Sequence, residues 1–487
     1  MGRRQVGLAA GRVTYHLGMN ESKGLRFSGS RKDVLGNLAA QVESIWAGFD
    51  TARESEPELN QASKDLLAMA LPEAGFGERQ SVDKSLTVLD QSIAQSRPRF
   101  FAYIGSSGLE IGAIADFLAS SYDINLAVDS GAASLLEKQT AAWIGEFIGY
   151  KDSKGLFASG GTISNITALA AARTKAQPAS RKSGITSPLA IYCSKEAHYS
   201  NIRAVELLGL GADSIRAIDI NERRKMKISA LRAAIEADIA AGIKPMAIIA
   251  SAGTTLTGAV DPLREIAALA KEFDIWMHVD GAYGAPAAGT DFVGDLFDGI
   301  DLADSVTIDA HKWLFVPKAC SILLVKDLRP LYNTFSHDEA YMPHDSDDYN
   351  PTDLTLEYSR PLRALKMWMG FYSHGAKEFR DAITSNLELA KLTYERAAVN
   401  ARFRVLPNAP QLSIVPIQYL PEGVIDVSAH NKELCLEIVR DGRIYISPAV
   451  IDGEVWLRPC YTNFRTSKED VDVMFEVIEE LSAKIRG

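Results

Sequence analysis

Between residues 111 and 370, short runs rich in β-branched and other apolar residues alternate with alanine-rich amphipathic stretches. This alternation is typical of βαβ units, in which helices connect the strands of a mostly parallel sheet. The stretch Pro262–Phe273 is one predicted helix, because its apolar residues recur at helical spacing. The predicted strands are Leu189–Cys193, Met246–Ala250, Ile275–Val279, Ser305–Ile308 and Ser321–Val325. The pattern therefore indicates an α/β domain built on a central sheet.

The chain on either side of this region has a different organisation. Residues 1–110 are mainly helical in pattern and carry no sign of a strand ladder. From about residue 381 onward the predicted order is helix, strand, helix, strand, helix, which suits a smaller α/β domain. We therefore expect an N-terminal helical segment at residues 1–110, a large domain at 111–375 and a small C-terminal domain at 376–487.

Composition excludes several kinds of partner. The chain has 52 Lys and Arg against 62 Asp and Glu, a formal net charge of −10, without a long basic run. Nucleic acids and acidic membrane surfaces are therefore not expected as partners. The longest apolar stretches, such as Pro245–Ala252, fall far short of the roughly 18 residues that a membrane-spanning helix needs. We therefore expect a soluble protein. The apolar run at Gln5–Ala10 is also too short for a signal peptide.

Cysteine and histidine spacings give no indication of a disulfide framework or a metal site. The cysteines are scattered without CxxC spacing, and the histidines form no HExxH pattern. No metal is expected, and a reducing, cytoplasmic location suits such a chain best. The four cysteines are Cys193, Cys320, Cys435 and Cys460.

Two polar residues follow neighbouring strands of the predicted sheet. Asp280 directly follows Ile275–Val279, and Lys312 follows Ser305–Ile308 within the sequence Asp-Ala-His-Lys-Trp. Because parallel strands end at one edge of a sheet, where α/β folds bind ligands, both side chains are expected at a ligand site. A lysine ammonium is costly to bury unpaired, so Lys312 either reaches solvent or acts as a nucleophile with a lowered pKa.

A third feature is Ser-Gly-Gly-Thr at residues 159–162, which precedes a helical run from Ile163 to Lys175. Backbone N–H groups at a helix N-terminus opened by glycine bind anions well. Together the three features match pyridoxal 5′-phosphate (PLP), which needs a lysine for its Schiff base, an anionic partner for its pyridine nitrogen and a phosphate cradle. Taken singly, Asp280 could cap a helix and Lys312 could be a solvated strand end, so the combination carries the prediction.

Five sequence motifs extend this match along the chain. They are FASGGTISN at 157–165, EAHYS at 196–200, SAGTTLTGAVDPL at 251–263, HVDGAYG at 278–284 and DAHKW at 309–313. In these motifs the chain resembles the group II PLP-dependent amino-acid decarboxylases, most closely the aromatic-L-amino-acid decarboxylases. The resemblance runs from Pro98 to the C-terminus. It implies a type I PLP-dependent, aspartate aminotransferase-like fold: a mostly parallel seven-stranded sheet with helices on both faces, and a small C-terminal α/β domain.

The resemblance also implies roles for individual residues. Lys312 would be the Schiff-base lysine, Asp280 the partner of the pyridine nitrogen, and His198 a catalytic residue that stacks on the ring and orients the substrate carboxylate. The other implied cofactor-binding residues are Gly161, Thr162 and His311 at the phosphate, Ala282 on the ring face opposite His198, Thr255 beside the ring, and Ser359 from the partner subunit. A site shared in this way implies a homodimer, with residues 1–110 as a dimer-forming arm.

Residues 336–353 contain five Asp and one Glu with few aliphatic residues, and this composition predicts a mobile loop. By resemblance, it is a catalytic loop whose Tyr341 protonates the substrate α-carbon after carbon dioxide leaves. Related aldehyde synthases carry phenylalanine at this position and divert the reaction to oxygen. Tyrosine at position 341 therefore favours simple decarboxylation.

The substrate class is suggested by three positions that resemble the side-chain pocket of the aromatic enzymes. These positions are Tyr103, Ile104 and Trp313. Two residues argue against a simple aromatic substrate: Asp123 and Asn125 stand where the animal aromatic enzymes have apolar residues. A substrate with a polar ring, an imidazole or an unusual side chain is therefore kept as an alternative. Arg458 resembles an arginine that binds the α-carboxylate in glutamate decarboxylases.

We therefore expect a carboxy-lyase that converts an L-amino acid, of the aromatic class, to its amine and carbon dioxide. One alternative is a decarboxylation-dependent oxidative deaminase that gives an aldehyde, hydrogen peroxide and ammonia. Another is a decarboxylase of histidine or of an acidic amino acid. A third is a non-catalytic homologue that uses its folded dimer for binding, and the intact set of Asp280, His198 and Lys312 argues against it.

Overall fold

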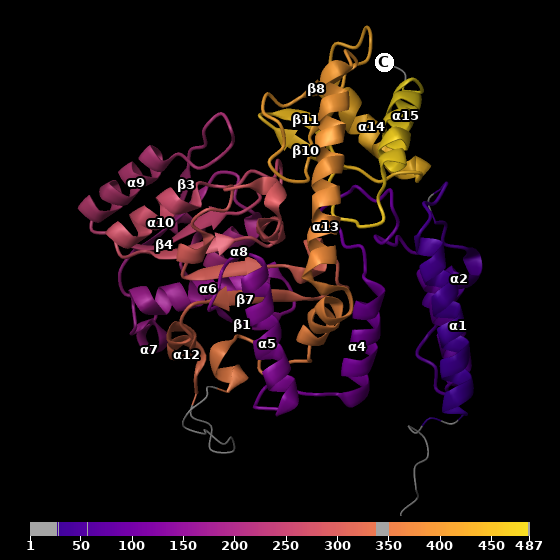
Figure 1. The fold of residues 1–487 in the computed structure, drawn as a ribbon, viewed down its shortest axis with the longest axis horizontal. Helices are drawn as coiled ribbons and strands as arrows, with labels where there is room; N and C mark the ends of the chain where they lie inside the picture. The colour runs from indigo at the N-terminus through magenta and orange to yellow at the C-terminus, as the bar shows by residue number, and fades with distance from the viewer. Residues whose placement is uncertain (1–26, 28, 56, 338–349, 486–487) are drawn as a thin grey trace, which may run out of the picture. The chain divides into compact units, whose positions relative to one another are not determined.

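The computed structural model describes residues 27, 29–55, 57–337 and 350–485 (Figure 1). Contacts divide the chain into two compact units, the smaller made of residues 1–45 and 58–92 and the larger of residues 46–57 and 93–487. The described part of the smaller unit is helical, as the sequence indicated. Its helices are most of α1 (Arg31–Phe49), α2 (Gln61–Leu67) and α3 (Glu78–Asp90).

Side-chain hydrogen bonds join two helices of the smaller unit. Asn37 and Gln41 of α1 donate from their side-chain amides to Oδ1 of Asp83 in α3, at 3.5 and 3.3 Å. Helix α2 begins at a side-chain cap, because Asn60 accepts a hydrogen bond from the backbone N–H of Ser63. These polar contacts fix how α1 and α3 lie against each other within the unit.

The larger unit is built on a seven-stranded sheet with the order β1-β7-β6-β5-β4-β2-β3. Strand β7 is antiparallel to both of its neighbours, and the other pairs are parallel. The mostly parallel seven-stranded sheet expected from the sequence is therefore confirmed. The strands are β1 (Lys154–Ala158), β2 (Leu189–Ser194), β3 (Ile215–Ile218), β4 (Lys244–Ser251), β5 (Trp276–Asp280), β6 (Ser305–Ile308) and β7 (Ser321–Val325).

Helices cover both faces of this sheet. Alternate residues of β7 show the two faces, because Ile322 and Leu324 join one buried apolar cluster while Leu323 and Val325 join another. The helices of this unit up to residue 399 are α4 (Glu110–Tyr122), α5 (Ala132–Phe147), α6 (Gly161–Ala176), α7 (Ser180–Ser183), α8 (Tyr199–Leu207), α9 (Ile228–Ala240), α10 (Leu263–Glu272), α11 (Ala310–Trp313), α12 (Arg329–Phe335) and α13 (Ala364–Val399). The first cluster packs α5, α9, α10 and α13, and the second packs α6, α8 and α12.

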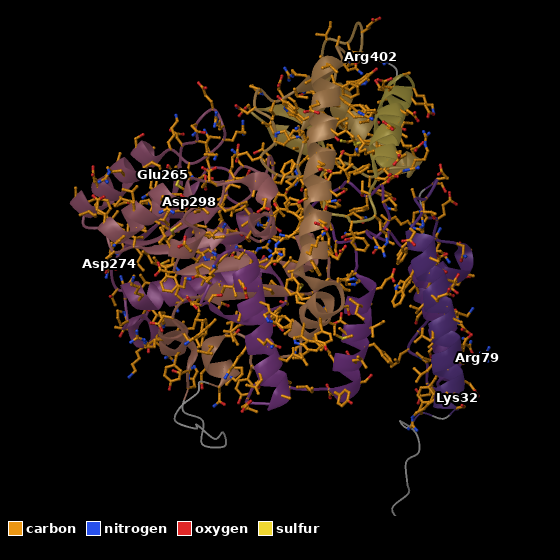
Figure 2. All side chains as sticks on the ribbon, in the orientation of Figure 1. Lys32, Arg79, Glu265, Asp274, Asp298 and Arg402 are labelled. Atoms are coloured by element: carbon orange, nitrogen blue, oxygen red, sulfur yellow. The ribbon has the colours of Figure 1, made fainter. Side chains whose placement is uncertain are left out.

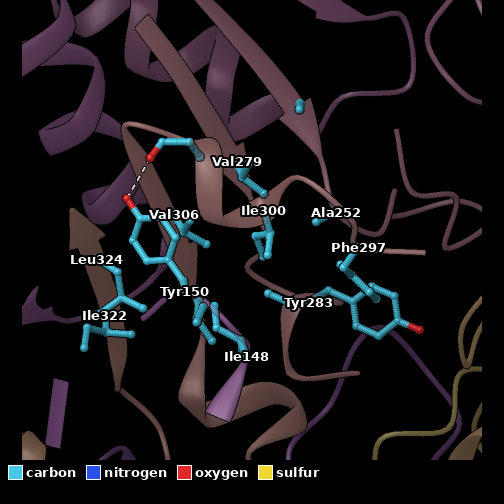
Figure 3. Packing of buried hydrophobic residues seen from close by; sticks show 14 of the residues in the cluster. Ile148, Tyr150, Ala252, Val279, Tyr283, Phe297, Ile300, Val306, Ile322 and Leu324 are labelled. Atoms are coloured by element: carbon cyan, nitrogen blue, oxygen red, sulfur yellow. Dashed lines mark hydrogen bonds between the residues drawn. The ribbon is translucent and has the colours of Figure 1, made fainter. Parts of the chain in front are cut away.

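The core is mainly apolar, and the charged side chains buried in it are few, such as the paired Arg360 and Glu137. Figure 3 shows the ring of Tyr150 among apolar residues of the first cluster, including Val306, while its hydroxyl donates to the Ala303 carbonyl at 2.8 Å. Exposed Glu265, in α10, and exposed Asp274, two residues after that helix ends, are labelled in Figure 2. Burial of the apolar face of α10 explains why its helical periodicity was readable in the sequence.

Two strands of the sheet were absent from the strands predicted from the sequence. Strand β1 starts at Lys154 and contains Gly155, and β3 is four residues long and mostly half-exposed. Short strands with glycine or charged residues lack the continuous apolar run by which the other five were recognised. The predicted helix Pro262–Phe273 corresponds to α10, which Pro262 and Phe273 flank.

A second, antiparallel sheet lies in the C-terminal part, with the order β10-β11-β9-β8. Its elements are β8 (Phe403–Val405), β9 (Ile417–Tyr419), α14 (Val427–Asp441), β10 (Ser447–Ile451), β11 (Glu454–Arg458) and α15 (Lys468–Ser482). Helix α13 is broken at Gly375, where φ is 74° and ψ is 157°. The division at residue 375, like the other domain limits, stays a prediction.

The topology places several strand ends together. Strands β2, β4, β5 and β6 are mutually parallel, and β1 runs in their direction because both it and β6 are antiparallel to β7. Their carboxyl ends therefore share one edge of the sheet, as the sequence predicted for Asp280 and Lys312. None of the helices in the described residues is both long and apolar enough to cross a membrane.

Candidate active site

A cavity of about 300 Å³ lies at the carboxyl edge of the seven-stranded sheet. Strand ends supply part of its wall, since Ser251 ends β4, Asp280 ends β5 and Asp309 directly follows β6. The residues singled out from the sequence that line this cavity are Ile104, Gly161, Thr162, His198, Thr255, Asp280, Ala282, His311 and Lys312. The fold thus brings together side chains from motifs that lie far apart in the sequence.

Lys312 lies in the short helix α11, and its ammonium is paired. Its Nζ is 2.9 Å from Oδ2 of Asp309, whose side chain is 5% exposed. Burial alone would lower the pKa of Lys312, but the carboxylates of Asp309 and Asp280 outweigh burial and raise the pKa above its ordinary value. Of the two alternatives drawn from the sequence, a solvated lysine or a nucleophile with a lowered pKa, the lowered pKa is not found in the cofactor-free chain, because Asp309 pairs with the ammonium.

Asp280 is held as an acceptor by three donors. Its Oδ2 accepts from Nδ2 of Asn165 and from Nδ2 of Asn201, each at 3.0 Å. Its Oδ1 accepts from the backbone N–H of Ala282 at 3.3 Å. These three donors fix the position of the Asp280 carboxylate at the cavity wall.

A directed chain of hydrogen bonds lies behind Asp280. Because Asn165 Nδ2 donates to Asp280, its Oδ1 must accept from Nε2 of His278, at 3.0 Å. His278 Nδ1 then accepts from the Ser305 hydroxyl at 2.8 Å, and Ser305 Oγ accepts from Nε1 of Trp276 at 2.9 Å. Burial lowers the pKa of His278 to about 4, which keeps the ring neutral and the direction of the chain fixed.

Asn165, Asn201 and His278 were not identified as site residues from the sequence. Asn165 and His278 lie inside two of the five sequence motifs, but the hydrogen bond between them joins residues 113 positions apart. The available signal was their polarity inside otherwise apolar elements, since Asn165 is 1% exposed and His278 is fully buried. A buried amide needs partners, and here the partner is Asp280.

The N-terminus of α6 forms an anion cradle. Its N-cap is Gly160, which has no side chain to cap the helix, so the first N–H groups at Gly161 and Thr162 have no intrahelical acceptor. A Cβ at Gly161 would lie 3.0 and 3.1 Å from the two carboxylate oxygens of Asp309 and 3.2 Å from the Cβ of Ala282. Glycine at 161 therefore keeps this space open, and an amine, a carboxylate and an anion cradle in one cavity fit PLP.

Two histidines line the same cavity. His198 is the N-cap of α8, and its Nδ1 accepts from the backbone N–H of Ser200 at 3.2 Å, so the neutral ring carries its proton on Nε2. Burial lowers the pKa of His198, although Asp280 partly opposes this shift. The His311 Nδ1 lies 2.8 Å from the carbonyl oxygen of Cys320 and 3.2 Å from its backbone nitrogen, and the closer oxygen makes Nδ1 the donor. Burial lowers the pKa of His311 as well.

The structure differs from the sequence-based interpretation of Trp313. This side chain is fully buried and donates from Nε1 to Oδ1 of Asn386 at 3.0 Å. It stacks on Tyr283 with ring centroids 5.2 Å apart, and it is Tyr283 that lines the cavity. Trp313 is therefore a core residue behind the wall rather than the wall itself, because α11 turns this side chain toward α13.

Among the described residues, the others proposed to bind the substrate or to enter the partner's site do not line this cavity. Tyr103 is 67% exposed, and its carbonyl accepts from Nη1 of Arg458 at 3.0 Å. Arg458 also donates from Nε to the Thr255 carbonyl at 2.7 Å, while its Nη2 is buried without a hydrogen-bond partner among the described residues. Ser359 is exposed and outside the lining of this cavity. Tyr341 lies outside the described residues.

The described residues contain no group of three or more His, Cys, Asp or Glu side chains arranged to hold a metal ion. Asp123 and Asn125, which raised the possibility of a polar substrate, are both exposed and do not line the cavity of this chain. Asn125 instead accepts from the backbone N–H groups of Ala127 and Arg360, at 3.0 and 3.1 Å.

Comparison with known proteins agrees with this geometry. The chain matches the pyridoxal-dependent decarboxylase conserved domain over residues 61–419. It is 33% identical over 449 residues to an aromatic-L-amino-acid decarboxylase from Bacillus atrophaeus, covering 89% of this chain and 92% of the relative. It is 27% identical over 451 residues to a 4-hydroxyphenylacetaldehyde synthase from Rhodiola rosea, covering 89% and 91%. The crystal structure of Oryza sativa TDC with PLP and tryptamine shares the fold, with a TM-score of 0.85 at 22% identity, covering 93% of this chain and 97% of that chain.

Proposed function

This chain belongs to the pyridoxal-dependent decarboxylase family, and we propose that it converts an aromatic L-amino acid into the corresponding amine and carbon dioxide. Family membership makes it a PLP-dependent carboxy-lyase that acts on an amino acid. The observation that carries the proposal is the cavity that joins Lys312, Asp280 and the N-terminus of α6. Each of these supplies one of the three contacts that the cofactor needs.

The chain's own residues would hold the cofactor at three points. Lys312 would bind it covalently through Nζ, and Asp280 would keep a negative charge beside the ring nitrogen, supported by the amides of Asn165 and Asn201. The N–H groups of Gly161 and Thr162 would bind the phosphate, with His311 beside them, while Thr255 and Ala282 would contact the ring. When bound, PLP accepts the electron pair that is released as the bond from Cα to the carboxylate breaks.

Other residues would bind the substrate and move protons. The proton on Nε2 of His198 can be donated to a substrate carboxylate in the cavity, because Nδ1 is already occupied by Ser200. Arg458 lies behind the cavity wall rather than in it: its Nε donates to the carbonyl of Thr255, which lines the cavity, and its buried Nη2 has no partner among the described residues. Tyr341 would supply the proton that the substrate α-carbon needs after carbon dioxide leaves.

The aromatic class is supported by the relative from Bacillus atrophaeus, which is an aromatic-L-amino-acid decarboxylase at 33% identity. Within the cavity, Ile104 offers an apolar contact, and Tyr283 presents a ring that Trp313 supports from behind. The charged Asp123 and polar Asn125 do not line the cavity of this chain, but Asn125 donates to Ser359 Oγ at 3.5 Å, so in a shared site the argument for a polar ring stands beside the aromatic one. An aromatic amino acid is therefore the preferred substrate class.

A homodimer with shared sites is part of the proposal. Four apolar side chains on α4 are exposed in the single chain, which is more apolar surface than one short helix usually leaves to water. They are Ile114, Phe117, Leu118 and Tyr122. The exposure of Ser359 outside its own chain's cavity supports a role in the partner's site. We expect light scattering to give twice the mass of one chain, Phe117→Asp to give a monomer, and Ile239→Asp, on exposed α9, to leave the dimer intact.

The four cysteines support the cytoplasmic location that we propose. All of them are unpaired and buried, and burial raises the pKa of the Cys320 thiol to about 12. Inert, reduced thiols suit a reducing compartment.

The substrate proposal is tested by measuring carbon dioxide release from a panel of L-amino acids with the PLP-loaded enzyme. Tyrosine, tryptophan, phenylalanine and 3,4-dihydroxyphenylalanine form the aromatic arm, and histidine, glutamate, aspartate and cysteine sulfinate form the competing arm. We expect kcat/KM for the best aromatic amino acid to exceed that of each competing substrate by at least about tenfold. Faster release from histidine or an acidic amino acid would overturn the aromatic class, and absence of turnover with every amino acid would favour a binding role.

A second candidate is the oxidative reaction that gives an aldehyde. The relative from Rhodiola rosea is a 4-hydroxyphenylacetaldehyde synthase, so both outcomes occur among proteins similar to this chain. Tyrosine at position 341 favours the amine, because related aldehyde synthases carry phenylalanine at this position. Product analysis for hydrogen peroxide and aldehyde separates the two reactions.

A further inference from the structure

The anion cradle contains a carboxylate, that of Asp309, with one oxygen that has no hydrogen-bond partner among the described residues. Asp309 Oδ2 is paired with Lys312, but Oδ1 is buried without a partner among the described residues. Both oxygens lie close to Gly161, since a Cβ there would be 3.0 and 3.1 Å from them. The carboxylate therefore lies against the first residue of α6, at the place where the helix offers N–H groups to an anion.

His311 adds a second acceptor beside the first. The His311 Nδ1 lies 2.8 Å from the carbonyl oxygen of Cys320 and 3.2 Å from its backbone nitrogen. Because the closer atom can only accept, Nδ1 carries the proton and the neutral ring has a lone pair on Nε2. This Nε2 lies 3.8 Å from Oδ2 of Asp309. Burial lowers the pKa of His311 even with Asp309 nearby, which favours the neutral ring. In this state neither side chain can donate a hydrogen bond to a phosphate oxygen.

The other charged groups around the cradle leave no surplus of positive charge. Among the described residues that line the cavity, two are cations and two are anions: Lys312, Lys318, Asp280 and Asp309. Lys318 is already engaged, with its Nζ 2.7 Å from Oε1 of Gln95. Titratable groups from several elements face Asp309 or His311. Those in direct reach are Lys312 on α11, Lys318 and Cys320 in the segment up to β7, and His198 at the start of α8. Asp280, at the end of β5, acts on this pair through Lys312.

We propose that binding of a phosphate group in this cradle takes up about one proton, which Asp309 and His311 share with a phosphate oxygen. The proposal rests on the assignment of this cavity as the PLP site. A phosphate ester is mainly a dianion above its second pKa of about 6, so its oxygens only accept hydrogen bonds. Without an added proton, these oxygens would face the Asp309 carboxylate and the neutral His311 ring, which are acceptors as well. The proton comes from the solvent, and affinity for a phosphate-bearing ligand therefore falls by roughly tenfold for each pH unit above neutrality.

The test compares two ligands that differ only in the phosphate. Pyridoxine 5′-phosphate lacks the aldehyde, so it cannot attach to Lys312, and pyridoxine shares its ring nitrogen but has no phosphate. Titration calorimetry of the cofactor-free protein at about pH 8, in two buffers of different ionisation enthalpy, measures proton uptake directly. We expect pyridoxine 5′-phosphate to take up about one proton more than pyridoxine, because uptake at the shared ring cancels.

Asp309→Asn replaces the unpartnered acceptor by an amide that can donate. In this variant the excess uptake should fall below about half a proton. Pyridoxine 5′-phosphate should bind about tenfold more tightly than to wild type at about pH 8, while the affinity for pyridoxine stays within about twofold.

Two results would overturn the inference, and a third would overturn its premise. An excess uptake below about half a proton in the wild-type protein contradicts it, whether or not the variant folds. If Asp309→Asn takes up as many excess protons as the wild-type protein, Asp309 does not hold the proton. Absence of binding of pyridoxine 5′-phosphate would instead contradict the cofactor site itself, which separates failure of the inference from failure of the proposed function.

Discussion

Asn165 Nδ2 lies 3.0 Å from Oδ2 of Asp280. Since Asn165 is the last donor of a chain that begins at Trp276, its side chain sets the position of the carboxylate. We predict that Asn165→Leu lowers the affinity for PLP by roughly tenfold to a hundredfold, because a hydrogen bond to a charged group contributes about 1.5–3 kcal/mol. Asn165→Asp, which has the same shape, should weaken binding at least as much by adding a like charge beside Asp280.

Fluorescence titration of the cofactor-free variants with PLP checks this prediction, with thermal melting as the measure of folding. Thr174→Val is the matched control, because Thr174 lies on the same helix and donates only to the carbonyl of Ala170, at 3.1 Å. If both Asn165 variants bind PLP as tightly as the control, Asn165 does not act through Asp280.

Because His278 is buried in its neutral form, we expect the free energy of unfolding of the cofactor-free protein to fall at acid pH. Burial lowers the pKa of His278 to about 4, below its unfolded value of about 6.5. The unfolded chain therefore binds a proton first as pH falls, so the stabilisation is complete above pH 6.5 and is lost on descent toward pH 4. The loss amounts to up to about 3 kcal/mol.

We predict that the free energy of unfolding of wild type falls more steeply between about pH 6.5 and pH 4 than that of His278→Gln, which stays neutral and can still donate to Asn165. Urea unfolding at several pH values measures both slopes. His374→Gln, at an exposed histidine, serves as the control and should follow wild type. Parallel curves for wild type and His278→Gln would show that His278 is not buried in its neutral form.

The positions of Asp280 and Lys312 were predictable because a strand is a local pattern and the ends of parallel strands meet at one edge. The motif at residues 157–165 likewise predicted the anion cradle, since glycine before a helix is a local signal. Both inferences need only the order of elements along the chain. The structure gathers these residues around one cavity.

The contacts that tune the site were not predictable in this way. The hydrogen bond between Asn165 and His278 joins residues 113 positions apart, and it depends on how α6 lies across β5. The direction of the Trp313 side chain depends on its packing against α13, and the raised pKa of Lys312 depends on the 2.9 Å contact with Asp309. Such contacts follow from tertiary packing, which local spacing does not encode.

The identity of residue 341 is expected to decide between amine and aldehyde. We predict that Tyr341→Phe increases hydrogen peroxide formed per carbon dioxide by at least about tenfold, because the phenol that would protonate the α-carbon is removed. A peroxidase-coupled assay run beside carbon dioxide release gives this ratio. Tyr332→Phe, on helix α12, is a control for loss of a phenol elsewhere and should keep the wild-type ratio. An unchanged ratio in Tyr341→Phe would remove this tyrosine from the chemistry.

The central claim is that Lys312 is the amine that binds PLP in the cavity at the sheet edge. Among the described residues, two lysines line this cavity, Lys312 and Lys318, so the claim can be decided by locating the bond. The PLP-loaded protein would be reduced with borohydride, digested, and mapped by mass spectrometry for pyridoxyl-lysine. The account predicts the label on Lys312, its loss together with the visible absorbance band in Lys312→Ala, and an unchanged label in Lys318→Ala. A label on Lys318, or an undiminished band in Lys312→Ala, would contradict it.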